Sequence, residues 1–404
     1  MSENGNMHFK ENFLGVMIEM KKRGPQQRQK KTLSAKGLLG LVKNDFESIK
    51  ISKGNSQESR GKPRTITIAN CLMSGLAVFS LKYPSLVAFD QHCNEKLIRH
   101  NLRTLYKIKQ SPCDTYMREQ LDEVDPKTLR KSFLSIFDEV RKGKLLEQYR
   151  FLDGYLIAID GTQIFHSEDV HCDNCCQKIH RDGRITYYHQ MVAGVIVHPQ
   201  REQVLPLCPE PISKRNEKNG CERNAAYRFL HDLKREHPRL RGIIVSDALA
   251  ANTPQINEIK SLGYGFIINV KLSNNCSLLE WLQGVDLQEV QLAYEKNRYR
   301  FRYINGVPLN GNEKAPSVNF LECEVEEVKG RKIIKKKFSW VTDRIITREN
   351  VFSIMQAGRA RWKIENETFN TLKNRGYQFE HNFGHGKKNR SRCVCSFDDA
   401  SFLH

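Results

Sequence analysis

The stretch YLIAIDGTQIFHS (residues 155–167) decides the fold that this sequence predicts. Its first five residues form a nearly continuous apolar run, which is typical of a strand buried on both faces of a sheet. Asp160-Gly161-Thr162 then interrupts the run, so the strand is expected to end here with the carboxylate of Asp160 at its tip. Acidic side chains in similar surroundings are therefore candidates to join Asp160.

Two further acids are candidates, one after a second apolar strand and one on a predicted helix. Asp247 follows the apolar residues of GIIVSDA (residues 242–248) and precedes a helix-like segment. Glu365 lies on a predicted helix that opens after Thr347 and Arg348. If the two strands are neighbours, Asp160 and Asp247 lie close together. Two aspartates and a glutamate in this order form a ligand set for a pair of hard divalent cations.

The segments around these acids predict an α/β fold. Residues 186–197 and 203–207 are β-rich and can pair with the first strand as an antiparallel meander. Apolar residues at four-residue intervals predict a helix over 221–236, and Pro254 near its start favours another over 253–262. Strands are expected at 242–247 and 265–270. The order is three strands, helix, strand, helix, strand.

Charge and composition constrain the partners. The chain has 404 residues, with 65 Lys and Arg against 46 Asp and Glu, a formal net charge of +19 that favours a polyanionic partner such as nucleic acid. The most apolar stretch, residues 71–81, is too short to cross a bilayer, and the N-terminus has no clean apolar signal core. We therefore expect a cytoplasmic protein whose twelve cysteines are reduced.

The regions outside the predicted α/β core differ from it in composition and in hydrophobic periodicity. Residues 1–60 are polar and basic and predict a flexible arm, either against phosphates or simply solvated. Residues 61–150 show helical periodicity and are expected to form a helical DNA-binding region. Residues 276–345 alternate in short segments joined by Gly and Asn turns, which predicts a β-rich insertion.

Several motifs stand out along the chain: LIAIDGTQIFHS, YYHQMVAGVIVHP, LPLCPEPI with CERNAAYRFL, IIVSDALAANTPQI, and RWKIENETFNTLKNRGYQFEHNFGHG. Together they resemble one family, the DDE transposases of bacterial insertion sequences, in the subgroup with a β-rich insert between the second Asp and the Glu. The resemblance implies an RNase H-like core over 151–275 and 346–388, with an N-terminal DNA-binding region. It also implies two Mg²⁺ or Mn²⁺ ions, a homo-multimer on the DNA ends, and association with the nucleoid. Asp160, Asp247 and Glu365 match the three acids of the family.

The helix signature of that family pairs an Arg and a Lys with the glutamate. Arg361 fits the spacing, whereas Lys373 falls one residue further on than usual. Because of this departure, Glu367 remains an alternative to Glu365 as the third acidic ligand. Gly358 stands where the signature has a Tyr. Arg361 and Lys373 are expected to face DNA phosphates near the metals.

A separate group of soft ligands lies after the first strand, with His166 and His171 nearby. Cys172, Cys175, Cys176 and His180 offer enough thiolate and imidazole for one structural zinc, and free cysteines in a polar loop are the alternative. His381 and His385 flank a glycine-rich turn and are interpreted as turn or phosphate contacts. Glu210 and Glu222 are interpreted as ion-pair partners of Arg223, Lys214 or Arg215.

The sequence therefore favours a DNA transposase. A non-catalytic DNA-binding relic and an RNase H-like nuclease without joining activity remain alternatives. Residues 389–404 are polar and aperiodic where a closing apolar helix is expected, which suggests a shifted reading frame near Lys388 and reduced activity.

Overall fold

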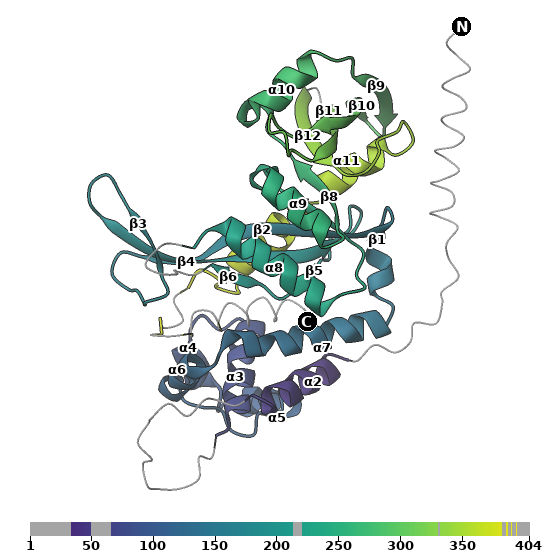
Figure 1. Ribbon diagram of the computed structural model, residues 1–404. Coiled ribbons are helices and arrows are strands. Elements are labelled where there is room, and N and C mark those ends of the chain that lie inside the picture. Colours follow the sequence, from purple (N-terminus) through teal and green to yellow (C-terminus); the bar gives the residue numbers. More distant parts are fainter. Residues whose placement is uncertain are drawn as a thin grey trace.

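The computed structural model describes residues 34–49, 66–212, 220–329 and 332–381, together with positions 385, 386, 389 and 393. Twelve strands in these residues form one mixed sheet with flanking helices (Figure 1). The strands are β1 (Arg150–Phe151), β2 (Gly154–Ser167), β3 (Cys176–Ile179), β4 (Ile185–Val197), β5 (Leu205–Pro206), β6 (Glu210–Ile212), β7 (Gly242–Ser246), β8 (Gly265–Asn269), β9 (Gln288–Tyr294), β10 (Asn297–Pro308), β11 (Ser317–Lys329) and β12 (Lys332–Thr342).

The helices lie in two groups along the chain. The first group is α2 (Ala35–Glu47), α3 (Ile68–Ser80), α4 (Leu86–His92), α5 (Lys96–Thr104), α6 (Asp114–Glu123) and α7 (Arg130–Lys142). The second group is α8 (Glu222–Glu236), α9 (Thr253–Ser261), α10 (Cys276–Gln283), α11 (Val351–Arg359), a π-helical turn (Ile364–Phe369) and α12 (Asn370–Asn374). The predicted α/β class is confirmed.

The sheet runs in the order β3-β4-β2-β7-β8-β12-β11-β10-β9. β4 is antiparallel to β2, whereas β7 is parallel to β2 and β8 is parallel to β7. The predicted antiparallel pairing of the second strand with the first is confirmed. The helices expected before and after β7 are also confirmed as α8 and α9.

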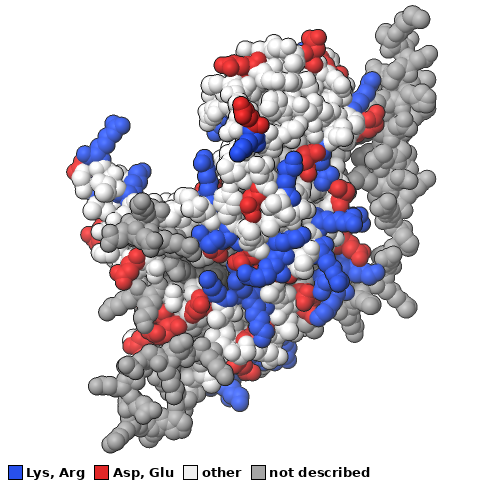
Figure 2. All heavy atoms as spheres, viewed as in Figure 1, with Lys and Arg blue, Asp and Glu red and all other residues white. Residues whose placement is uncertain are grey.

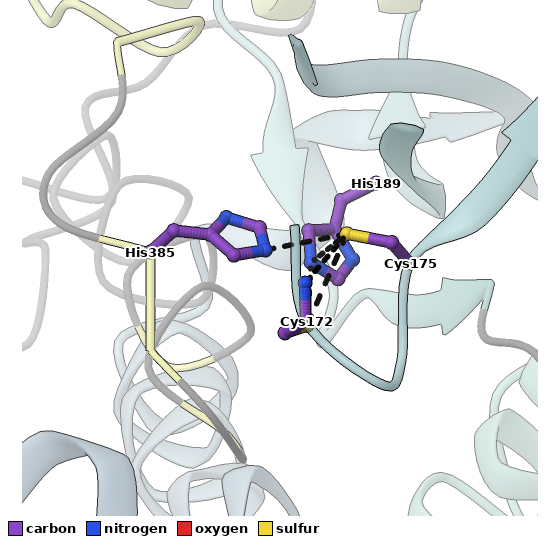
Figure 3. Close-up of side chains that lie close together, drawn as sticks. All are labelled: Cys172, Cys175, His189 and His385. Atoms are coloured by element: carbon purple, nitrogen blue, oxygen red, sulfur yellow. Dashed lines mark hydrogen bonds between the residues drawn. The ribbon is translucent and has the colours of Figure 1, made fainter. Parts of the chain in front are cut away.

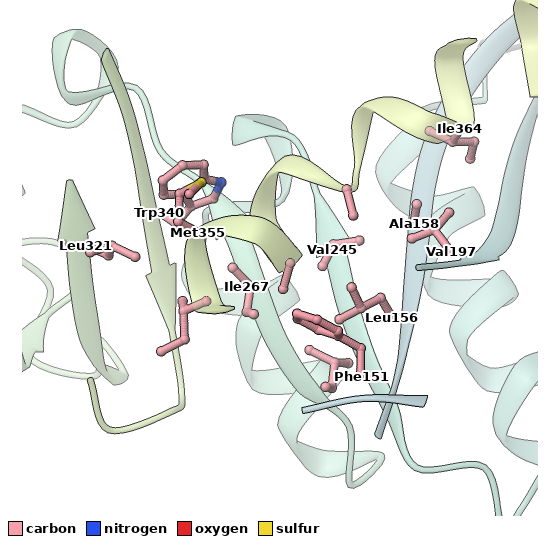
Figure 4. Packing of buried hydrophobic residues seen from close by; sticks show 14 of the residues in the cluster. Phe151, Leu156, Ala158, Val197, Val245, Ile267, Leu321, Trp340, Met355 and Ile364 are labelled. Atoms are coloured by element: carbon pink, nitrogen blue, oxygen red, sulfur yellow. The ribbon is translucent and has the colours of Figure 1, made fainter. Parts of the chain in front are cut away.

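Two hydrophobic cores cover the two faces of this sheet. Leu156 and Ala158 of β2 pack in the core that holds α11 and the π-helical turn (Figure 4). Ile157 and Ile159 point to the opposite face, where α8 and α9 contribute Phe229 and other apolar side chains. Because neighbouring side chains on a strand alternate between faces, a continuous apolar run is what a doubly covered strand requires. The expectation of a strand buried on both faces is therefore confirmed.

The predicted end of that strand is wrong. β2 continues through Asp160-Gly161-Thr162 to Ser167, and Asp160 pairs with Ala193 in the middle of it. The reason is β4, which is long enough to supply backbone partners along the whole of β2. The strand that ends near Asp160 is β7, the parallel partner of β2, and its last residue is Ser246.

The helices before β1 form a separate hydrophobic cluster, which includes Leu72 and Phe79 of α3. Helix α2 lies inside the range predicted to be a flexible arm, and that part of the prediction is wrong. Ser34 caps α2, and Leu39, Val42 and Phe46 are buried in the cluster. The rest of the predicted arm lies outside the described residues, as does most of the tail over 389–404.

The predicted β-rich segment begins with a helix, α10, and then continues as the antiparallel strands β9 to β12. β12 pairs with β8, so these strands extend the same sheet rather than forming a second one. Trp340 of β12 is buried under α11 (Figure 4), and Gly358 of α11 lies directly against its ring. A Cβ at position 358 would collide with that indole, which explains why no larger residue occupies this position.

In the parts of the chain that the structure describes, none of the helices combines the length and apolar character needed to span a bilayer.

Candidate active site

Asp160 and Asp247 are brought together by the register of two parallel strands. Ala158 of β2 pairs with Val245 of β7. Two residues further along the chain come Asp160, within β2, and Asp247, directly after the end of β7. The Ser246 hydroxyl donates to the carbonyl oxygen of Ile159 at 3.3 Å, which holds the strand ends together just before the carboxylates. Asp247 also caps the short 3-10 turn Ala248–Ala250 by accepting from the Leu249 N–H at 3.0 Å.

Glu365 reaches Asp160 through a shared arginine. Arg361 Nη1 lies 2.9 Å from Asp160 Oδ2 and 2.7 Å from Glu365 Oε1. The Arg361 and Asp160 side chains are each 16% exposed, whereas the Glu365 side chain is 51% exposed. One guanidinium therefore bridges a partly buried carboxylate on the sheet and a more accessible carboxylate in the π-helical turn.

The segment that carries Glu365 is anchored on both sides of the acid. Ile364 and Phe369 of the π-helical turn are buried in the core shared with β2. Lys363 is also buried, and its Nζ donates to the Arg201 carbonyl oxygen at 2.6 Å. Burial lowers the pKa of Lys363, and the negative charge of Glu367 only partly opposes this shift. Of the two rival glutamates, Glu365 is the one that meets Arg361.

The acids influence each other electrostatically. Burial raises the pKa of Asp160 to about 7, against the opposing effect of the Arg361 guanidinium. The negative charges of Glu365 and Asp247 raise it further. A buried carboxyl surrounded by carboxylates is poorly stabilised as an anion unless positive charge is supplied. The arrangement is thus suited to bind cations.

Glu222 is a fourth acid at this site, and the sequence interpretation as an ion-pair partner missed its position. A Cβ placed on Gly161 would lie 2.5 Å from Glu222 Oε2, so the carboxylate lies directly over the backbone next to Asp160. Burial and the charge of Asp247 raise the pKa of Glu222. Lys214 and Arg215, two of the partners predicted for it, lie outside the described residues.

Helix α8 reaches this position because Phe229 packs against Gly194 of β4, where any side chain would collide with the ring. Gly194 pairs with Ile159, so the close helix–strand contact lies beside the first acid. The sequence predicted the helix α8, but it did not predict that the first turn of this helix lies over Gly161. Glu210 does form ion pairs, with Arg228 at 2.5 Å and Arg130 at 3.8 Å.

Lys373 does not join the acids in this structure. Its Nζ lies 2.7 Å from Glu380 Oε1, in the segment that follows α12. The proposed contact with DNA phosphate therefore stays a prediction, and it would require Lys373 to leave Glu380.

The Cys/His group takes a different form from the one predicted. Cys172 and Cys175 converge with His189 of β4 and with His385, and their ligand atoms all lie within 4.8 Å of one another (Figure 3). Cys176 is buried in the core on the α8 face of the sheet, and His180 bonds instead to Thr186 Oγ1 at 2.8 Å. His385, interpreted from the sequence as a turn or phosphate contact, lies 3.2 Å from Cys175 Sγ. His171 stacks on Tyr187.

Basic side chains gather on one face of the molecule. Figure 2 shows Lys and Arg concentrated over the region where α7 and α8 lie side by side in Figure 1. This face accords with the formal net charge of +19.

Neither a scan against protein-family models nor a search of curated proteins found a match to this chain.

Proposed function

We propose that this protein is a DNA transposase that cuts and joins phosphodiester bonds with the help of two divalent cations. The observation that carries the proposal is the convergence of Asp160, Asp247 and Glu365 from two strands and a helix on one small region around Arg361. The sheet supports an RNase H-like core, because antiparallel β4 and β2 continue into parallel β7 and β8 with α8 and α9 between them.

The donor set fits hard divalent cations. Mg²⁺ and Mn²⁺ prefer carboxylate oxygens, and three carboxylates with Glu222 beside them provide these without any thiolate or imidazole. Burial is the main cause of the raised pKa of Asp160, and the negative charges of Glu365 and Asp247 add to it against the opposing Arg361 guanidinium. Ions held by Asp160, Asp247 and Glu365 would stabilise the attacking and leaving oxygens of the phosphoryl group.

The chain's own residues set the geometry for this reaction. Asp160 and Asp247 are fixed by the strand register, whereas Glu365 is half exposed and able to accept a hydrogen bond from a water or a DNA 3′-hydroxyl. Arg361 holds Glu365 toward Asp160 and is positioned to contact a phosphate oxygen as well, because a guanidinium has five N–H donors.

The proposed partner is double-stranded DNA. The protein is proposed to bind it as a homo-multimer, at the two ends of the insertion sequence. A nuclease that does not join strands would share the same acids. A relic would retain the basic surface and bind DNA, but it would not cut.

The test uses a plasmid that carries the gene with its own flanking DNA. The purified protein is expected to cut at the element's ends with Mg²⁺ or Mn²⁺ and to join the freed 3′ ends to a second plasmid. Chelation with EDTA should abolish both products. Cutting without joining would favour the nuclease, and binding without cutting would favour the relic.

Glu222→Gln gives a sharper test of the acidic site. We expect the Mg²⁺ concentration for half-maximal cutting to rise about tenfold, because an uncharged amide beside Asp247 attracts cations less strongly. Cutting rates measured across a Mg²⁺ titration check this. Glu280→Gln, in the exposed part of α10, is the control and should leave the titration unchanged. An unchanged Glu222→Gln titration would remove Glu222 from the site.

A further inference from the structure

Four metal-ligating side chains from three separate segments converge away from the acidic site. Cys172 and Cys175 come from the loop between β2 and β3, and His189 comes from β4. His385 comes from the chain beyond α12, about 200 residues further along the sequence. Figure 3 shows the four side chains close together, with both imidazole rings near the Cys175 sulfur.

Four of the six distances between these atoms are close to the edges of a zinc-sized tetrahedron, and all six are within 4.8 Å. With zinc–sulfur and zinc–nitrogen bonds of about 2.3 and 2.0 Å, ideal edges are about 3.8 Å between two sulfurs and about 3.5 Å between sulfur and nitrogen. The two sulfurs are 3.9 Å apart, and His189 Nε2 lies 3.5 Å from each of them. His385 Nε2 lies 3.2 Å from Cys175 Sγ.

Neither a disulfide nor a magnesium site fits the arrangement as well. A disulfide needs sulfurs about 2.05 Å apart, and these cysteines are free. Two thiols and two imidazoles are soft ligands that favour zinc over magnesium, and Cys175 and His189 are almost fully buried. Four protein ligands close the coordination shell, which is the mark of a structural rather than a catalytic zinc site.

We propose that Cys172, Cys175, His189 and His385 bind one structural Zn²⁺. This zinc would fasten the segment after the Glu365 helix to the β2–β4 hairpin that carries Asp160. Aromatic contacts support that role: the His385 ring stacks on His189 at 5.0 Å and packs on Phe165 of β2 at 4.6 Å between ring centres. The site does not depend on the proposed function.

The first measurement is the zinc content of the purified full chain, by elemental analysis after growth with added zinc. One zinc per chain is expected for the wild type. Cys172→Ser and His385→Ala should each lose it, whereas His385→Cys should retain it because a thiolate replaces the imidazole. His180→Ala and Cys221→Ser are matched controls outside the cluster and should keep full zinc content.

The second measurement replaces zinc with Co²⁺. The wild type should show the intense visible bands of tetrahedral cobalt together with thiolate-to-cobalt charge transfer, and His385→Ala should show weaker, shifted bands. Removing zinc by a chelator should lower the Tm of the wild type but not that of His385→Ala. The comparison of His385→Ala with His385→Cys keeps the test decisive if Cys172→Ser does not fold.

Two results would overturn the proposal: wild type without zinc, or full zinc content in both Cys172→Ser and His385→Ala. Loss of zinc in His180→Ala would instead favour the ligand set expected from the sequence and equally reject this one. Because zinc content and cobalt spectra need no DNA, a failure here is distinguishable from a failure of the transposase proposal.

Discussion

Asp160→Asn is expected to lower the rate of Mg²⁺-dependent cutting at least about 1,000-fold, which corresponds to about 4 kcal/mol of transition-state stabilisation. The amide has nearly the same size and can still accept the hydrogen bond from the Gly161 N–H, which is 2.9 Å long in the native protein. It removes an acid that interacts electrostatically with both Asp247 and Glu365. Single-turnover cutting of the flanking-DNA plasmid measures the loss.

The matched control is Asp286→Asn, which makes the same chemical change in an exposed loop before β9. It should cut at the wild-type rate. Circular dichroism and DNA retardation of Asp160→Asn should both match the wild type, so that lost cutting is not lost folding or lost binding. If Asp160→Asn cuts as fast as the native chain, the three-acid site is not the source of the activity.

Arg130→Met is expected to destabilise the fold by about 3 kcal/mol. Arg130 in α7 is 12% exposed and contacts Glu236 at 2.5 Å and Asp232 at 3.2 Å, both in α8. It also lies 3.8 Å from Glu210 of β6. Methionine retains much of the apolar stem but removes the cation that these carboxylates share. Glu236, whose side chain is 8% exposed, would then be paired with the exposed Arg235, and poorly compensated buried charge is costly. Urea unfolding should show a lower midpoint.

Arg141→Met tests the same substitution on the same helix. The Arg141 guanidinium pairs with Asp138 at 3.0 Å, and both side chains are more than half exposed. The effect of this substitution is expected within about 0.5 kcal/mol because exposed ion pairs contribute little. If Arg130→Met is no worse than Arg141→Met, α7 is not coupled to α8 through Arg130.

Much of the core architecture follows from local patterns. The apolar run before Asp160 and the run before Asp247 are strands, and the four-residue spacing of Ala225, Phe229 and Leu233 is a helix. These elements were predictable because burial on two faces or on one stripe leaves a direct trace in residue order. Asp160 and Asp247 were visible for the same reason, as polar residues that follow apolar runs, whereas Glu365 was singled out by its position on a predicted helix.

The length of β2 was not predictable in the same way. Asp160-Gly161-Thr162 has the composition of a strand end, yet β4 supplies backbone partners on beyond it to Ser167. Backbone pairing between strands depends on the neighbour rather than on the strand's own side chains. The prediction therefore failed where a long partner outweighed local polarity.

Sequence order alone was sufficient for the core strands β4 and β7 and for the helices α8 and α9, because each is marked by its own neighbours along the chain. Only the tertiary structure decided three other features of the molecule. It places Glu222 over Gly161, joins Asp160 and Glu365 through Arg361, and brings Cys172 and Cys175 next to His189 and His385. Each of these joins residues far apart in the chain through packing and strand register. Such contacts leave no periodic signal, since they depend on which faces and edges the fold brings into contact.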